Sequence, residues 1–247
     1  NATRARRTSV KDLVKRLTEC YGPSGHEGQI REMIRSEVES VADGMRVDRL
    51  GNLIATKQGS GSGKRIMLAA HMDEIGLIVS YVDKNGYLRF QPIGGLDPMT
   101  LVGGRVQFED GAIGVICPEK RQDFRKEPSL SKLFVDVSAT GFEGAEGRLG
   151  QAAGFVRPFV DMGARIVAKA LDDRISCAVL IDLLRRVQDT PHEISFVFSV
   201  QEEVGLRGAR TSAFGLHPDI GIAVDITVAA DTPEAPKLAM ELGKGPC

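Results

Sequence analysis

The sequence contains no tryptophan, and aromatic residues make up only 5% of its 247 positions. Such a composition argues against a carbohydrate site, since sites of that kind commonly use aromatic faces. The four cysteines lie far apart with no paired spacing: Cys20, Cys117, Cys177 and Cys247. This spacing predicts neither a disulfide framework nor a cysteine zinc site, and it fits the reducing cytosol.

Charge of one sign is also lacking, because 33 acidic and 32 basic residues leave a formal net charge of −1. Both signs are scattered, so there is no basic surface for phosphate backbones and no polybasic helix for acidic lipid. No apolar run is long enough to span a bilayer, and no apolar segment follows the basic stretch at 1–7. We expect a cytoplasmic protein that binds neither nucleic acid nor membranes.

The first part of the sequence predicts an α/β fold. Apolar residues at helical spacing predict helices over 11–17 and 28–41, and Ser24 in the turn between them can cap the second helix. Strands are expected within 46–57 and at 66–70, where an unbroken apolar run is typical of a strand buried on both faces.

The middle of the chain has a different pattern of apolar and turn-forming residues. From residue 76 to about 158, short β runs surround tight turns, with Asn85-Gly86 and Asp110-Gly111 placed as hairpin turns require. This region predicts a small inserted β-barrel-like domain, which we assign to residues 76–159. It interrupts a domain formed by residues 1–75 and 160–247.

The α/β texture returns after Ile166. A helix is predicted over 173–187, with the apolar face Ile175, Val179, Leu183, Leu184 and Val187. Buried strands are expected at 194–200 and 220–224, with a short helix near 207–214 between them. Together these elements predict a doubly wound mixed sheet with helices on both of its faces.

Candidate metal ligands follow the predicted strands. In open α/β sheets the ligand crevice lies beyond the carboxyl ends of the strands. One strand runs into His71-Met72-Asp73, a second into Glu202-Glu203 and a third into Asp225, while Asp172-Asp173 opens the long helix. Each cluster alone also fits an ordinary role, as a local hydrogen bond, a helix cap or a turn. Their joint occurrence at one sheet edge predicts a metal site.

The spacing within each cluster suggests a division of labour. His71 and Asp73 point to the same side of a strand, so Asp73 can hold one ring nitrogen while the other binds metal. The neighbouring side chains of Glu202 and Glu203 diverge, so one can bind metal while the other faces water. One carboxylate of the Asp172-Asp173 pair could bridge two cations. Carboxylates mixed with one imidazole suit Zn²⁺, Co²⁺ or Mn²⁺.

Four segments resemble the dinuclear aminopeptidases of metallopeptidase family forty-two, which includes glutamyl aminopeptidases and tetrahedral, dodecameric enzymes. They are Gly22–Gly25, Ala70–Gly76, Ala170–Arg174 and Gln201–Gly205. The resemblance extends in the right order over nearly the whole chain. It implies a cytoplasmic metallo-aminopeptidase that acts on short peptides, forms homo-oligomers up to the dodecamer, and uses its inserted domain for assembly and substrate access.

The resemblance also implies roles for individual residues. His71 and Asp225 would bind one metal ion, Asp172 would bridge two, and Glu203 would bind the other; the ions would be Zn²⁺ or Co²⁺, or Mn²⁺. Glu202 would be the general base of catalysis, and Asp73 would orient His71. The peptide bond between Asp172 and Asp173 would be cis.

The sequence departs from this family at one ligand. The second metal ion should have a terminal histidine well beyond Asp225, but the four histidines are His26, His71, His192 and His217. Family members also continue through further strands and a helix, so we expect the catalytic domain to lack its C-terminal segment.

Two other functions stay open at this point. An inactive or assembly-only subunit of the same fold would explain the absent histidine. Glycoside hydrolysis by paired carboxylates is the weaker alternative, because it leaves His71 without a role.

Overall fold

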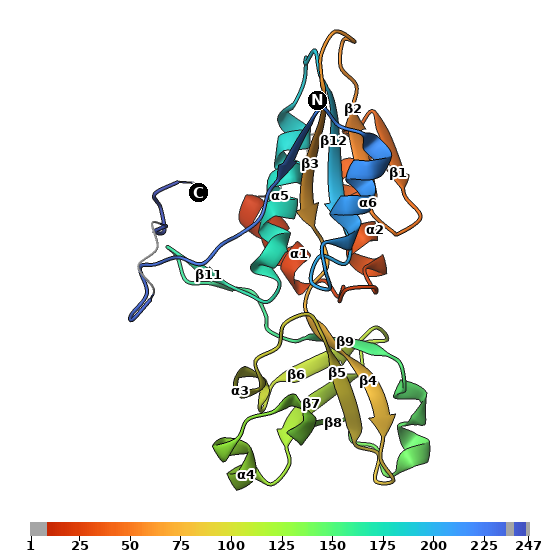
Figure 1. Cartoon of the computed structure of the whole chain (residues 1–247), viewed down its shortest axis with the longest axis vertical. Helices are drawn as coiled ribbons and strands as arrows, with labels where there is room; N and C mark the ends of the chain where they lie inside the picture. The colour runs from red at the N-terminus through yellow and green to blue at the C-terminus, as the bar shows by residue number, and fades with distance from the viewer. Residues whose placement is uncertain (1–8, 236–239, 246–247) are drawn as a thin grey trace, which may run out of the picture.

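The computed structural model describes residues 9–235 and 240–245 and contains an α/β unit and a separate six-stranded barrel (Figure 1). The α/β unit is built on one sheet with the strand order β1-β2-β12-β3-β13. Its strands are Gly44–Val47 (β1), Leu53–Lys57 (β2), Arg65–His71 (β3), Glu193–Ser199 (β12) and Ile220–Ala223 (β13). Because β3 is parallel to β12 and β13 while β2 is antiparallel to β12, the sheet is mixed, as predicted.

Helices cover both faces of this sheet (Figure 1). One face packs against α1 (Val10–Glu19), α2 (Gly28–Val38) and α5 (Leu171–Arg186), and the other against α6 (Arg207–Leu216). The alternation of side chains along a strand explains the division, since Leu68 and Ala70 enter the first core while Met67 and Ala69 enter the second. The doubly wound arrangement predicted from the sequence is confirmed.

The second unit is a closed barrel with the strand order β4-β5-β8-β7-β6-β9. Its strands are Gly76–Val82 (β4), Leu88–Ile93 (β5), Arg105–Phe108 (β6), Ile113–Pro118 (β7), Leu133–Asp136 (β8) and Ala152–Phe155 (β9). Gly86 and Gly111 adopt positive φ angles of 89° and 88° in the two predicted hairpin turns. The barrel has a hydrophobic core of its own, which includes Leu77, Val106 and Phe108.

Short elements complete the fold. They are the helices α3 (Pro98–Leu101) and α4 (Arg121–Lys126), the 3₁₀ helices Leu130–Lys132, Phe142–Gly144 and Glu146–Arg148, and the strands β10 (Val160–Asp161) and β11 (Ile166–Val167). The antiparallel pair β10 and β11 lies between the barrel and α5 along the chain. Among the described residues, no helix combines the length and the apolar character that crossing a membrane requires.

The apolar face predicted for α5 is correct only in part, since Leu184 is buried and Ile175 and Val187 pack against the core. Val179 and Leu183 are exposed, and the buried apolar residues of the helix are Cys177, Ala178, Leu180, Ile181 and Leu184. Apolar side chains occupy two neighbouring stripes of this helix, so periodicity alone could not choose between them. Contacts with α1 and β3 bury the stripe that contains Cys177 and Ile181.

The predicted burial of the strand 220–224 is also wrong. All four residues of β13 are exposed, with Ile220 at 38% and Ile222 at 47% relative accessibility. The physical reason is position, because β13 is the edge strand of the sheet and pairs only with β3 in the described part of the chain. An apolar run cannot by itself distinguish an edge strand from a central one.

Candidate metal centre

The carboxyl ends of β3, β12 and β13 bring the predicted ligands together. Donor atoms of His71, Asp172 and Asp225 all lie within 4.8 Å of one another. Donor atoms of His71, Glu202 and Glu203 form a second group with the same spacing. His71 ends β3, the two glutamates follow β12, and Asp225 follows β13, so the parallel strands explain why distant segments meet.

His71 stands at the centre of both groups and is 3% exposed. Its Nε2 lies 2.9 Å from Oδ1 of Asp172 and 3.7 Å from Oε2 of Glu202. Oδ1 of Asp73 lies 3.3 Å from Nδ1, on the opposite side of the ring, although the Nδ1 atom makes no hydrogen bond with the described residues. The ring therefore faces Asp172 and Glu202 with one nitrogen and Asp73 with the other.

Asp73 is fully buried and contacts more than the imidazole. Its Oδ1 accepts a hydrogen bond from the backbone N–H of Glu202 at 3.0 Å, and its Oδ2 accepts one from that of Glu203 at 3.2 Å. The Ser24 hydroxyl donates to Oδ2 as well. The predicted helix cap is therefore wrong, because Ser24 binds Asp73 and no side chain caps α2. Asp73 joins the imidazole to the turn that carries both glutamates.

The two aspartates at the start of α5 occupy different environments. The Asp172 side chain is 55% exposed and faces Nε2 of His71. Asp173 is fully buried, and its Oδ2 accepts a hydrogen bond from the backbone N–H of His71 at 3.2 Å. The peptide bond between them is cis, which confirms this expectation from the resemblance. Asp172 thus faces the cluster, while Asp173 supports the end of β3 through its hydrogen bond with the His71 N–H.

Crowding of the acidic groups changes their proton affinity. Burial raises the pKa of Glu203 to about 7, and repulsion from Asp172 and Asp73 adds to this effect. Burial also raises the pKa of Glu202, again with repulsion from neighbouring carboxylates. Burial lowers the pKa of His71, but the contacts with Asp172 and Asp73 outweigh it and raise that pKa to about 11. Negative charge is therefore in excess around the ring.

These observations fit a divalent cation. Several carboxylates face one imidazole, and the side chains of Lys169 and Arg174 nearby are directed to other partners. A cation would offset the repulsion among the carboxylates, and the mixture of oxygen and imidazole nitrogen donors suits Zn²⁺ and related ions. Of the four histidines in the sequence, His71 is the one that belongs to these groups.

A buried ion pair lies behind the cluster. Nζ of Lys169 contacts both carboxylate oxygens of Glu74, at 2.8 and 2.7 Å. The fully buried Arg174 donates to the carbonyl oxygen of Leu17 at 2.6 Å. Glu74 follows Asp73 in the sequence and Arg174 follows Asp173, so these contacts fix the backbone beside the candidate ligands. Sequence patterns alone predict no role for Glu74 or Lys169, although Glu74 lies within one of the motifs.

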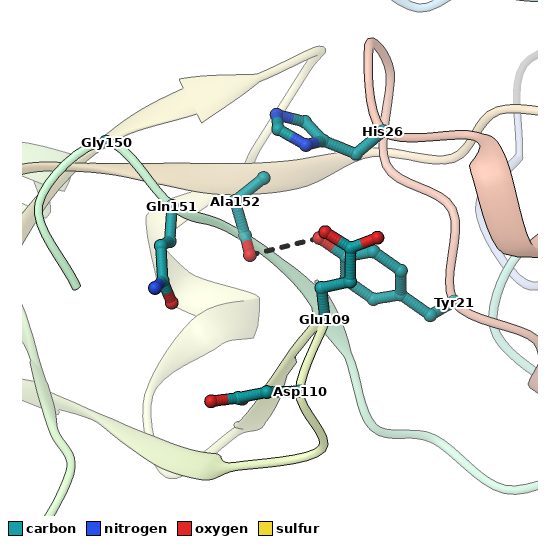
Figure 2. A pocket seen from close by; sticks show the side chains of 7 residues that line it. All are labelled: Tyr21, His26, Glu109, Asp110, Gly150, Gln151 and Ala152. Carbon is teal, nitrogen blue, oxygen red and sulfur yellow. Dashed lines mark hydrogen bonds between the residues drawn. The ribbon is translucent and has the colours of Figure 1, made fainter. Parts of the chain in front are cut away.

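One cavity lies between the α/β unit and the barrel, and another lies beside the edge strand β13. The cavity in Figure 2 has a volume of about 360 Å³ and is lined by Tyr21, His26, Glu109, Asp110, Gly150, Gln151 and Ala152. It contains none of the predicted ligands, and the Tyr21 hydroxyl donates across it to the carbonyl oxygen of Ala152 at 3.1 Å. A second cavity, of about 350 Å³, includes Asp225 in its lining. The candidate metal centre therefore borders the second cavity.

Comparison with known proteins shows which family the chain resembles. A family model described as M42 glutamyl aminopeptidase matches residues 51–247. A protein of Acetivibrio thermocellus named as an aminopeptidase is 46% identical over 237 residues, which cover 95% of this chain and 71% of that protein. A lysyl aminopeptidase of Pyrococcus furiosus is 39% identical over 249 residues, with coverage of 95% and 71%.

Solved structures show the same fold. An aminopeptidase from the archaeon Desulfurococcus kamchatkensis superimposes with a TM-score of 0.90 at 38% identity and covers 96% of this chain and 69% of that one. For the TET1 peptidase of Pyrococcus horikoshii, which can assemble into a tetrahedron or a large octahedral shell, the TM-score is 0.79 at 33% identity, with coverage of 91% and 72%. An endoglucanase of Thermotoga maritima superimposes with a TM-score of 0.78 at 37% identity and covers 90% of this chain and 68% of that one.

The match to the family model extends over most of the sequence, and the relatives cited above exceed 30% identity over most of their own length. The chain belongs to the M42 glutamyl aminopeptidase family, whose members are metal-dependent hydrolases.

Proposed function

We propose that this chain removes the N-terminal residue of short peptides by metal-assisted hydrolysis. Glu202 is the general base, and His71, Asp172, Glu203 and Asp225 are the metal ligands. The observation that carries the proposal is the meeting of these five side chains in two groups that share His71. Side chains from four separated segments converge there, and no single local hydrogen bond or helix cap accounts for all of them.

The first group fits one cation, and the division of the ligands between two cations is the one that the family resemblance implies. His71, Asp172 and Asp225 provide one imidazole nitrogen and two carboxylates for the first ion. Asp172 would be shared with the second ion, for which Glu203 would be the other ligand among the described residues, although the donor atom of Glu203 is grouped with those of His71 and Glu202. No histidine follows Asp225 in the sequence. The donor set favours Zn²⁺ or Co²⁺, with Mn²⁺ as the next choice.

When bound, the cations would supply Lewis acidity that polarises the scissile carbonyl and acidifies water. Side chains of the protein transfer the proton and hold the reacting groups in position. Glu202 accepts a proton from the attacking water and passes it to the leaving amine. Its raised pKa suits this exchange, because a carboxyl group that titrates closer to neutral pH both accepts and releases a proton readily. Asp73 holds the glutamate turn in place through the N–H groups of Glu202 and Glu203.

Removal of metal tests the proposal directly. Purified protein dialysed against a chelator is expected to lose hydrolysis of aminoacyl chromogenic substrates, and addition of Co²⁺ or Zn²⁺ is expected to restore it. The reason is that a bound cation lowers the pKa of the attacking water and polarises the scissile carbonyl, which Glu202 alone does not do. Metal per chain is measured on the same samples. A chain that binds metal but hydrolyses no substrate would instead be the assembly-only subunit.

Glycoside hydrolysis is the second candidate, because one structural relative is an endoglucanase. A hydrolase that relies on two carboxylates needs no metal, so its activity would survive the chelator. The central position of His71 disfavours this function, since two carboxylates would suffice for it. Chelator-resistant hydrolysis of a β-glucan would overturn the aminopeptidase proposal.

We further propose that residues 76–159 form an inserted domain for assembly and substrate access, and that residues 1–75 and 160–247 form the catalytic domain. The closed barrel and its separate core support this division. The barrel also exposes apolar side chains, among them Tyr81, Met99 and Leu149. The TET1 peptidase forms large shells, so we expect a homo-oligomer such as a dodecamer. Light scattering that finds only a monomer would contradict this expectation.

A further inference from the structure

The loop at residues 22–27 lies against the metal centre, although no role follows for it from the metal ligands themselves. Its backbone pairs with the segment after β3, because Ser24 N–H donates to the Glu74 carbonyl at 3.2 Å and Glu74 N–H donates to the Gly22 carbonyl at 3.1 Å. Gly22 is closely packed, since a Cβ atom there would lie 2.6 Å from Cγ2 of Ile30. The loop is therefore held rigidly beside the strand that ends in His71.

Two buried carboxylates bind three consecutive backbone N–H groups of the glutamate turn. Oε1 of Glu27 accepts from Gln201 at 3.2 Å, and the two oxygens of Asp73 accept from Glu202 and Glu203. Gln201 has a φ angle of 55°, in the left-handed region that non-glycine residues rarely adopt. The turn that aims Glu202 and Glu203 thus contains an unfavourable backbone conformation and is held by side chains from outside it.

The burial and the hydrogen bonds of Glu27 indicate that its carboxylate serves the contact with Gln201. Glu27 is 5% exposed and makes no ion pair within residues 9–235 and 240–245. A carboxylate buried without a cationic partner is costly unless hydrogen bonds offset the loss of water. Its Oε1 accepts two of them, one from Gly25 N–H at 2.7 Å within the loop and one from Gln201 in the turn. The second links the loop to the catalytic segment.

We propose that Glu27 is a positioning residue that fixes the backbone of Gln201 and thereby aims Glu202 and Glu203 at the reacting groups. The inference rests on the proposed function, since it gives these two glutamates a task that requires exact placement. It assigns a function to the loop at residues 22–27, which contains the motif Gly22–Gly25 singled out in the sequence and which the metal ligands left unexplained. Ser24 helps to hold the same turn, because its hydroxyl donates to Asp73, which accepts the N–H groups of Glu202 and Glu203.

The test compares two substitutions of similar shape. Glu27→Gln keeps an acceptor oxygen at the end of the side chain, whereas Glu27→Met keeps the length and removes the acceptor. Glu32→Met is the matched control, because Glu32 lies on α2, the helix that begins directly after Glu27, with its side chain 60% exposed. Each full-length protein is loaded with Zn²⁺, and metal content, kcat, KM and amide hydrogen exchange are measured.

Glu27→Met is expected to speed exchange of the Gln201 amide about tenfold or more, because a hydrogen bond to a charged group is lost. Its kcat is expected to fall about tenfold or more with a smaller change in KM, since misplacement affects the reacting geometry more than substrate binding. Zinc content should fall less than kcat, because Glu203 is the only one of the four proposed metal ligands that lies in this turn. Glu27→Gln should recover most of kcat and of the protection, and Glu32→Met should behave as the wild type.

Equal kcat and equal Gln201 exchange in Glu27→Met and the wild type would overturn the inference. So would equal losses in Glu27→Met and Glu27→Gln, because the acceptor would then be irrelevant. If Glu27→Met does not fold, Glu27→Asp takes its place, because its carboxylate is one methylene shorter and moves the acceptor away from the Gln201 N–H; faster Gln201 exchange is expected, and unchanged exchange there would overturn the proposal. A wild-type protein without aminopeptidase activity would refute the proposed function, while amide exchange would still decide whether Glu27 holds the turn.

Discussion

Replacement of Glu202 by glutamine is expected to lower kcat by about 10² to 10⁴ fold while the zinc content stays unchanged. Glutamine has nearly the shape of glutamate but cannot accept a proton from water. The backbone of residue 202 is held by Asp73 through its N–H group, so the substitution leaves the turn in place. Loss of turnover without loss of metal is what distinguishes a general base from a ligand.

The measurement combines steady-state hydrolysis of an aminoacyl chromogenic substrate with metal analysis of the same preparation. Glu193→Gln is the matched control, because Glu193 begins β12 at the end of that strand remote from the metal centre and its side chain is exposed. Glu202 and Glu203 both lie in one donor group with His71, so their roles could be exchanged. A Glu202→Gln protein that loses zinc would show that Glu203 is the base and Glu202 the ligand.

The sequence predicted the meeting of these side chains because their positions follow simple geometric rules. Parallel strands end at one edge of a sheet, so His71, Glu203 and Asp225 could be expected to meet once their strands were recognised. The period of two along a strand likewise placed Asp73 on the same side as His71, and its carboxylate lies 3.3 Å from the ring. The fold class followed from the same patterns of apolar residues.

The remaining features depend on packing that local patterns do not encode. Ser24 has the residue type and position of a helix cap, yet a buried carboxylate 49 residues away binds its hydroxyl. Glu27 reads as an ordinary residue at the start of a helix, and its contact with Gln201 joins positions that are 174 residues apart. The burial of α5 and the exposure of β13 depend on which elements lie beside them. Such long-range contacts are visible only once the chain is folded.

Replacement of Asp172 by alanine is expected to weaken the binding of both cations by more than about a hundredfold, because it removes the ligand that they share. Calorimetric titration of the chelator-treated protein with Zn²⁺ measures the effect. The Asp172 side chain is 55% exposed, so its removal leaves no large cavity and the metal-free protein should unfold at nearly the same temperature. Asp182→Ala, on the same helix, is the control, since Asp182 pairs with Arg186 away from the metal centre.

Replacement of Asp173 by alanine should instead lower stability and leave zinc affinity less affected. The Asp173 carboxylate is buried and accepts the backbone N–H of His71, so Asp173→Ala should lower the unfolding temperature of the metal-free protein. If Asp172→Ala keeps two zinc ions per chain while Asp173→Ala releases them, the bridging ligand is Asp173. The two substitutions therefore separate a ligand from a structural support, because a ligand affects zinc affinity before stability and a support affects stability even without zinc.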